Sequence, residues 1–306
     1  METRDAELRE KISALKEKRN AVILAHNYQL GEVQDIADFV GDSLELSQNA
    51  AKTGAEVIVF CGVHFMAETA SILCPDKVVL LPDINAGCPM ADMISAERLR
   101  EKKKKHPQAV VVCYINSSAE VKAESDICCT SANGVGVIES LDAREILFIP
   151  DQYLGDYISA KTGKKMILWP GFCPTHIRIK PEMIKELKQE YPQAKVVVHP
   201  ECRPEVIALA DEVLSTSGMC RYAQRNEVRE MVVGTELGII HRLKKENPGK
   251  RFIPVSKQVI CPNMKLITLD KILWTLEEMN PEVKVPEEIR LRAKAAVNKM
   301  LKIGAK

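Results

Sequence analysis

The sequence predicts an α/β fold of three homologous β-α-β-α-β domains around a pseudo-threefold axis, with a central active site. Three observations support this prediction. A segment of 23 residues occurs three times in the 306-residue chain, each copy opens on an apolar run, and polar residues and cysteines recur at matching positions. Self-similarity at a fixed period indicates one structural unit used repeatedly.

The three copies begin at Ala21, Ala109 and Ala194, so successive copies are shifted by 88 and 85 residues. They align without a gap. Four positions hold the same kind of residue in every copy. They are a glutamate (Glu32, Glu120, Glu205), a valine (Val33, Val121, Val206), an aspartate (Asp38, Asp126, Asp211) and a final hydroxyl (Ser43, Ser131, Thr216). So many matches over so short a segment indicate a true repeat.

The apolar run that opens each copy is typical of a strand buried on both faces of a parallel sheet. In the first copy a polar turn follows, and apolar residues at Val33, Ile36, Ala37 and Val40 predict a helix. Second strands are expected at 56–61, 145–149 and 231–233, and third strands at 77–81, 165–169 and 251–255. Each repeat therefore predicts a small parallel sheet, whose strands would present ligand-binding loops at their carboxyl ends.

Helical patterns flank the repeats at Leu8–Leu15 and Ile289–Met300. The predicted organisation is a first repeat with an N-terminal helix (1–106), a second repeat (107–191), a third repeat (192–280) and a C-terminal helix (281–306).

Composition limits the classes of partner. Lys plus Arg number 43 and Asp plus Glu number 42, so a net charge of +1 offers no overall attraction to nucleic acid or to an anionic membrane. The first 20 residues are charged throughout and lack the apolar core of a signal peptide. No apolar stretch approaches the roughly 18–20 residues of a membrane span. We therefore expect a cytoplasmic protein without a nucleic-acid or membrane partner.

Ten cysteines in such a protein favour metal binding, redox chemistry or simple burial over disulfides. A Cys-Pro pair stands just past the third strand of each repeat, at Cys88, Cys173 and Cys261, whereas the Cys-Pro at Cys74 is out of register. Equivalent positions in three repeats are expected to converge on one axis. Three thiolates there would leave one metal position open, as a zinc site or as a [4Fe–4S] cluster, and spacing does not decide between them.

Polar side chains follow the first strand of each repeat in pairs two residues apart, so both members of a pair point the same way. The pairs are His26 and Tyr28, Tyr114 and Asn116, and His199 and Glu201. With the hydroxyls of Ser43, Ser131 and Thr216 they predict nine hydrogen-bonding groups around one axis, suited to carboxylate or phosphate. The three hydroxyls could instead be simple helix N-caps. His176, three residues after Cys173, is a candidate for contact with the metal site.

The chain resembles the quinolinate synthase A family in a set of motifs that runs in order through residues 20–270. The motifs are AHNYQ (25–29), GDSLELSQ (41–48), GCPMADM (87–93), CCTSAN (128–133), GFCPTH (171–176), HPEC (199–202), STSGM (215–219) and CPNMK (261–265). The resemblance implies three α/β domains around one [4Fe–4S] cluster. It also implies condensation of iminoaspartate with dihydroxyacetone phosphate to quinolinate, phosphate and water, in NAD biosynthesis, with a functional link to L-aspartate oxidase.

The resemblance also implies roles for individual residues. The cluster, one per chain with one iron not ligated by cysteine, falls on Cys88, Cys173 and Cys261. Substrate binding falls on His26, Ser43, Tyr114, Ile115, Asn116, Ser131, His199, Pro200, Glu201 and Thr216. The acid–base candidates are Glu201, Tyr28, His26 and His199. Some family members carry C-x-x-C-x-x-C around the last ligand, whereas Cys261 stands alone in QVICPNMK, so a disulfide switch there is not expected.

Two other functions agree with a three-cysteine site. An iron–sulfur hydro-lyase with an unrelated substrate would share the open iron. A zinc-stabilised repeat protein that binds partners would be colourless, and it would leave the polar residues beside the metal without a purpose.

Overall fold

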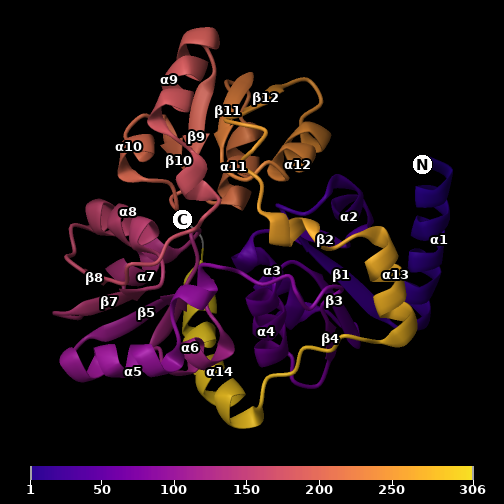
Figure 1. Cartoon of the computed structure of the whole chain (residues 1–306), viewed down its shortest axis with the longest axis horizontal. Helices are drawn as coiled ribbons and strands as arrows, with labels where there is room; N and C mark the ends of the chain where they lie inside the picture. The colour runs from indigo at the N-terminus through magenta and orange to yellow at the C-terminus, as the bar shows by residue number, and fades with distance from the viewer. Residues whose placement is uncertain (1, 305–306) are drawn as a thin grey trace.

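The computed structural model describes residues 2–304 as three four-stranded, wholly parallel sheets with helices packed around them. The sheets form three lobes about the centre of the molecule (Figure 1). In sheet order the strands are β2 (Phe39–Gly41), β1 (Ala21–His26), β3 (Val57–Cys61) and β4 (Val78–Leu80) in the first lobe. They are β6 (Ile127–Cys129), β5 (Val110–Tyr114), β7 (Ile146–Ile149) and β8 (Ile167–Leu168) in the second, and β10 (Glu212–Val213), β9 (Lys195–Val198), β11 (Glu230–Gly234) and β12 (Arg251–Pro254) in the third.

Fourteen α-helices and three short 3₁₀ turns are described in residues 2–304. The helices are α1 (Glu2–Lys18), α2 (Gly31–Ile36), α3 (Ser43–Lys52), α4 (His64–Leu73), α5 (Ala96–Lys105), α6 (Ala119–Ala123), α7 (Gly134–Glu139), α8 (Gln152–Thr162), α9 (Pro181–Glu190), α10 (Pro204–Ile207), α11 (Thr216–Ala223), α12 (Ile239–Glu246), α13 (Leu269–Glu278) and α14 (Glu287–Leu301). The 3₁₀ turns are η1 (Ala91–Met93), η2 (His176–Arg178) and η3 (Pro262–Lys265). Helix α13 packs on α1, and α14 packs on α6 and β6 (Figure 1).

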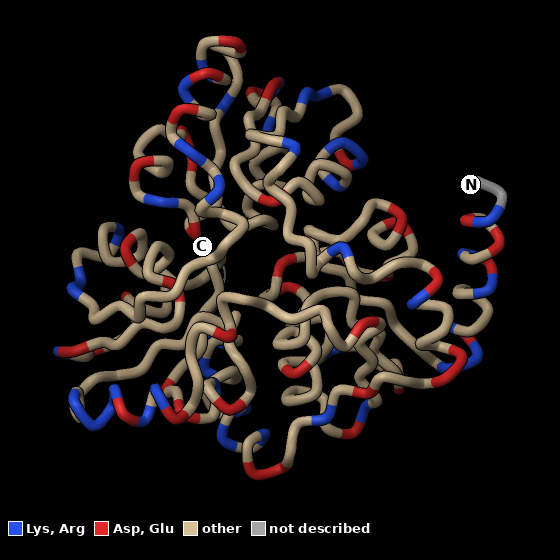
Figure 2. Tube along the Cα trace, viewed as in Figure 1, with Lys and Arg blue, Asp and Glu red and all other residues tan. Residues whose placement is uncertain are grey.

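The predicted parallel strands are confirmed, and the apolar runs are buried as their composition predicts. Ile23, Val111 and Val196 are fully inaccessible to solvent. Both signs of charge are interspersed around the periphery (Figure 2), in keeping with the balanced composition. None of the helices in the described part of the chain is long and apolar enough to cross a membrane.

The helix predicted through Val40 is wrong, and each repeat contains one strand more than predicted. Helix α2 ends at Ile36 because Ala37 has an extended backbone, and Phe39–Gly41 then pairs with the end of β1. Equivalent short strands, β6 and β10, flank the first strands of the other lobes. The apolar residues that follow the helix are therefore strand residues, which a helical pattern does not distinguish over so short a stretch.

The aligned aspartates explain why this extra strand recurs. The carboxylates of Asp38, Asp126 and Asp211 each accept a hydrogen bond, at 2.7–2.8 Å, from a backbone amide of the first strand in their own lobe. The backbone amide of each aspartate donates back to the carbonyl of that same strand residue. This two-way clip holds the chain beside the first strand and sets the direction in which it reaches Ser43, Ser131 and Thr216.

Lys122 joins the first and second lobes from a fully buried position. Its ammonium donates to the carbonyls of Ser117, at 2.6 Å, and of Phe65, at 3.3 Å. Glu68 accepts from the backbone amide of Ala119 across the same boundary, and burial raises the pKa of its carboxyl.

We expect Lys122→Met to lower the free energy of unfolding by about 3 kcal/mol, because it leaves Glu68 and two carbonyls without their buried cation. Urea unfolding would measure this loss. Adding Glu68→Gln removes the uncompensated charge and should restore part of the stability. Equal stabilities of the wild-type and Lys122→Met proteins would contradict the linking role.

Candidate active site

A cavity of about 70 Å³ lies where loops from all three lobes meet. It is lined by residues that follow the carboxyl ends of the strands, where ligands bind in parallel α/β sheets. The sequence-predicted residues that line it are His26, Tyr28, Ser43, Cys88, Tyr114, Asn116, Ser131, Cys173, His199, Glu201, Thr216 and Cys261. Ile115 borders a small neighbouring pocket beside Ser43, and Pro200 is not among the lining residues of this central cavity.

The interpretation of the three hydroxyls as N-caps is wrong. The carboxylate of Asp42 caps α3 and the hydroxyl of Ser215 caps α11, each accepting from amides of the first turn. Ser43 and Thr216 are consequently the first residues of their helices. The remaining hydroxyl, that of Ser131, lies 3.2 Å from Nε2 of His199 rather than capping α7. All three hydroxyls line the cavity.

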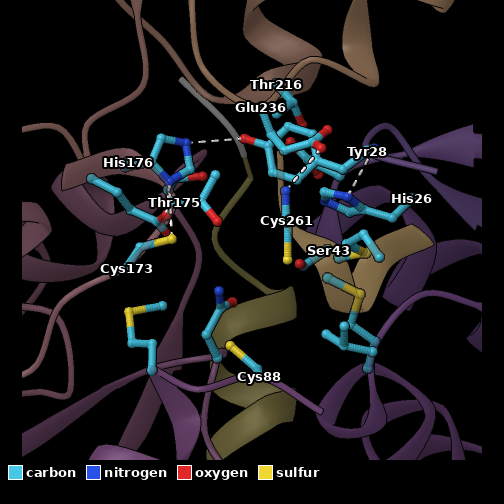
Figure 3. Close-up of a pocket in the computed structure, with 18 of the residues that line it drawn as sticks. His26, Tyr28, Ser43, Cys88, Cys173, Thr175, His176, Thr216, Glu236 and Cys261 are labelled. Carbon is cyan, nitrogen blue, oxygen red and sulfur yellow. Dashed lines mark hydrogen bonds and ion pairs between the residues drawn. The ribbon is translucent and has the colours of Figure 1, made fainter. Parts of the chain in front are cut away.

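Of the ten cysteines in the chain, the three that stand in register line the cavity and the other seven do not. Figure 3 shows the sulfur atoms of Cys88, Cys173 and Cys261 directed from three sides toward a common space. Burial raises the pKa of each thiol, to about 12 for Cys88, so a bound metal would have to displace their protons. The donors are thus gathered and oriented for a soft, thiolate-binding metal group.

A single zinc ion held by three cysteines needs closely spaced sulfurs. Zn–S bonds of about 2.3 Å would place the sulfurs about 3.8 Å apart. Within the described residues, the three groups whose ligand atoms all lie within 4.8 Å of one another are Cys173, His176 and Glu201 instead. That trio is compatible with a metal cofactor at this position, and it adds two donors to the cysteine set.

His176 lies at the centre of a buried hydrogen-bond network that joins all three lobes. Its Nδ1 lies 2.7 Å from Oε2 of Glu201 and 3.1 Å from Sγ of Cys173. Its Nε2 lies 2.8 Å from the hydroxyl of Thr235, which in turn lies 2.5 Å from the hydroxyl of Tyr28. His176 therefore links the cysteine side of the cavity to the predicted tyrosine and glutamate.

Glu201 supplies a negative charge to the site at neutral pH. Burial alone would raise the pKa of Glu201, but His176 and the hydroxyl of Tyr114, which donates at 2.5 Å, lower it to about 2. Burial lowers the pKa of His26 and of His199 to about 3, so both rings are neutral. Burial also raises the pKa of Tyr28 and Tyr114 well above 10, which keeps both hydroxyls as donors.

Thr235 and Glu236 are site residues that the sequence reasoning missed. They follow the second predicted strand of the third repeat, whereas the polar pairs and cysteines predicted from the sequence follow first and third strands. Glu236 is fully buried, accepts from the backbone amide of Cys261 at 3.1 Å and pairs with Lys265 at 3.0 Å. The ammonium of Lys265 also donates to the carbonyl of Tyr28. The position at the end of a buried parallel strand was the signal that could have found them.

A second network fixes the hydroxyl of Thr216. Arg242 donates to Oδ1 of Asn27 at 2.8 Å, which sets the orientation of the amide, and Nδ2 of Asn27 donates to Thr216 at 2.8 Å. With its oxygen already accepting, the hydroxyl of Thr216 is left to donate its own proton to another group.

We expect Asn27→Asp to reverse this polarity, because a carboxylate only accepts and would draw the proton of Thr216 away from an anionic substrate. KM for that substrate should rise about tenfold, the worth of one hydrogen bond to a charged group, while the ion pair with Arg242 preserves the fold. Steady-state kinetics would measure KM and kcat, with the exposed Asn226→Asp as the control of equal charge. An unchanged KM would contradict the assignment.

Comparisons with known proteins bear on the identity of this site. The family described as quinolinate synthetase A protein matches residues 10–302. A protein named quinolinate synthase from Dehalococcoides mccartyi (strain CBDB1) is 66% identical to this chain, over 96% of this chain and 97% of that protein. Another of the same name, from Geobacter sp. (strain M21), is 59% identical over 97% of each chain. One from Methanosarcina barkeri (strain Fusaro) is 56% identical over 97% of this chain and 98% of its own length. With its three cysteines and polar groups gathered in one cavity, the chain belongs to the quinolinate synthase A family.

Proposed function

We propose that this protein is a quinolinate synthase of NAD biosynthesis, a transferase that condenses iminoaspartate with dihydroxyacetone phosphate to quinolinate, with loss of phosphate and water. The observation that carries the proposal is the convergence of Cys88, Cys173 and Cys261 on a cavity lined by polar groups, among them the buried, ionised carboxylate of Glu201. Membership of the family and the names of its relatives support the same reaction.

In this proposal the three cysteines would hold one [4Fe–4S] cluster, and His176 would hydrogen-bond to the sulfur of Cys173. When bound, such a cluster supplies a Lewis-acidic iron with one position not ligated by cysteine. The neutral thiols would release their protons as the group is loaded.

Substrate anions would be held by hydroxyls at the starts of helices. Ser43 and Thr216 are the first residues of α3 and α11, where backbone amides and the helix dipole favour negative charge. Ser131 and Asn116 complete the set from the second lobe. Holding both substrates in one small cavity brings their reacting carbons together, which removes much of the entropic cost of condensation.

Acid–base steps would use the network around His176. Tyr28 and Tyr114 carry protons that they could donate, and the neutral rings of His26 and His199 could accept one. Glu201 is ionised, and its pKa would rise toward a useful value when the anionic groups of the substrates approach it. It would then serve as a base for proton removal during dehydration.

The three lobes would be related by a pseudo-threefold axis through the cavity, with repeats at 1–106, 107–191 and 192–280 and the C-terminal helix at 281–306. The imine substrate implies an upstream oxidation of L-aspartate, which L-aspartate oxidase would provide.

Anaerobic purification followed by iron and sulfide assays tests the cofactor, and quinolinate formation from the two substrates tests the reaction. We expect a brown protein with four irons and four sulfides per chain, and quinolinate as the product. A colourless protein that contains zinc would contradict the assignment of a [4Fe–4S] cluster. A protein that holds the cluster but forms no quinolinate would contradict the proposed reaction.

A further inference from the structure

A surface groove of about 610 Å³ opens between the second and third lobes beside the central cavity. Its walls come from the start of α7 and from α8 on one side, and from β10 and α11 on the other. Ser131 lines both the groove and the central cavity. It is half-buried, whereas His199, Glu201 and Thr216 deeper in the cavity are less than 5% exposed. Ser131 therefore marks the point where the two spaces adjoin.

The groove is positive although the whole chain is nearly neutral. Lys161, Arg221 and Arg225 line it, against the single carboxylate of Glu212. Arg221 is partly neutralised by Glu45, at 3.6 Å. The exposed side chains of Lys161 and Arg225 lie over the rings of Tyr157 and Tyr222, at 5.7 and 4.9 Å, which holds both cations in place without a carboxylate.

The boundary that the groove follows is loosely tied outside the central cavity. The hydroxyl of Tyr157 donates to the carbonyl of Val213 at 3.4 Å, a long hydrogen bond. The boundary between the first and third lobes is tied more tightly. There Arg242 donates to Asn27 and Val40, both at 2.8 Å, and Asp35 binds Lys245 at 2.6 Å. The strong contacts between the second and third lobes lie inside the central cavity instead, where Glu201 accepts from Tyr114 at 2.5 Å and lies 2.7 Å from His176. The groove therefore follows the less tightly bonded outer edge of this boundary, up to Ser131.

We propose that this groove is the anion-binding entrance to the central cavity, with Lys161 and Arg225 as the side chains that attract the substrate. The class of ligand is a small organic phosphate or dicarboxylate, an identity that rests on the proposed function. The groove has the size of a small-molecule site, and its excess of cations over carboxylates raises the local concentration of anions.

The test removes the two cations with Lys161→Gln/Arg225→Gln, both at exposed positions where folding is not at risk. At low ionic strength, kcat/KM for the phosphate-bearing substrate should fall about tenfold with kcat nearly unchanged, and the difference should shrink at about 0.2 M salt. The charge-matched control is Lys105→Gln/Lys188→Gln, whose exposed positions lie outside the groove. An equal loss of kcat/KM in the control, or an unchanged kcat/KM in Lys161→Gln/Arg225→Gln at low ionic strength, would contradict the proposal that the groove is the entrance.

A second measurement separates this inference from the proposed function. Inorganic phosphate binding, followed by ³¹P NMR, should weaken at least fivefold in Lys161→Gln/Arg225→Gln and remain unchanged in the control. If the wild-type protein forms no quinolinate, the proposed function fails while the phosphate comparison still tests the groove. Equal phosphate affinity in the wild-type and variant proteins would refute the groove as an anion site.

Discussion

Cys173→Ala is expected to abolish turnover and to remove the bound iron, with a loss of at least about a hundredfold in kcat. Cys173 is one of three sulfurs that point into the cavity, and it alone contacts the ring of His176, at 3.1 Å. A missing thiolate would leave two iron sites without protein ligands, and the site has no other cysteine to replace it. Iron and sulfide assays, the visible spectrum and steady-state kinetics would together measure the effect.

Cys220→Ala provides the matched control for this substitution. Cys220 is also buried, but it lies on α11 away from the cavity lining. The control should keep its cluster and its turnover, because the substitution removes only one small apolar group from the core. Full iron content with full activity in Cys173→Ala would be incompatible with the three-cysteine site, whereas equal losses in both variants would indicate a general defect of folding.

Glu201→Gln is expected to lower kcat by about 10² to 10⁴, the usual worth of a positioned acid–base group. The substitution keeps the shape of the side chain but removes the one charge that both Tyr114 and His176 approach. Both residues would lose a charged partner, and the proposed base would disappear. Kinetics under saturating substrates would report kcat, and thermal unfolding would show whether the fold survives.

Glu205→Gln is the control for the charge, since Glu205 lies four residues on, at the exposed start of α10. We expect its kcat to match that of the wild-type protein. If Glu201→Gln also kept full turnover, Glu201 would be neither the base nor an essential charged acceptor. A loss of thermal stability without a loss of kcat per folded molecule would assign Glu201 a structural role only.

Much of the site could be predicted from the sequence because aligning the three repeats identifies positions that are equivalent in the fold. Cys88, Cys173 and Cys261 stand at equivalent positions, and homologous units that pack around one point bring equivalent positions together. Register also predicts that His26, Tyr114 and Glu201 lie after the first strands, and all three line the cavity. Register did not reveal Glu236, because the equivalent position is acidic in only one of the other two repeats. It is Asp151 in the second repeat but the apolar Val63 in the first.

The extra strands escaped prediction for a different reason. Phe39–Gly41 spans only three residues, too few for a period of two to be told from a helical turn. Its strand conformation depends on the clip between Asp38 and Ile23, a contact between residues 15 apart in the chain. Short elements are set by such tertiary contacts more than by their own propensity.

By itself, the sequence determined the α/β class, the threefold repetition, the three convergent cysteines and the family that their motifs resemble. Periodicity and register are properties of the chain, and they survive without coordinates. Only the tertiary structure decided which ionisable groups lie close enough to change one another's protonation state. The low pKa of Glu201, the link from His176 to Cys173 and the positive groove between two lobes all depend on distances between residues far apart in sequence. Electrostatic effects fall off with distance and grow with burial, so no pattern in the sequence could have supplied them.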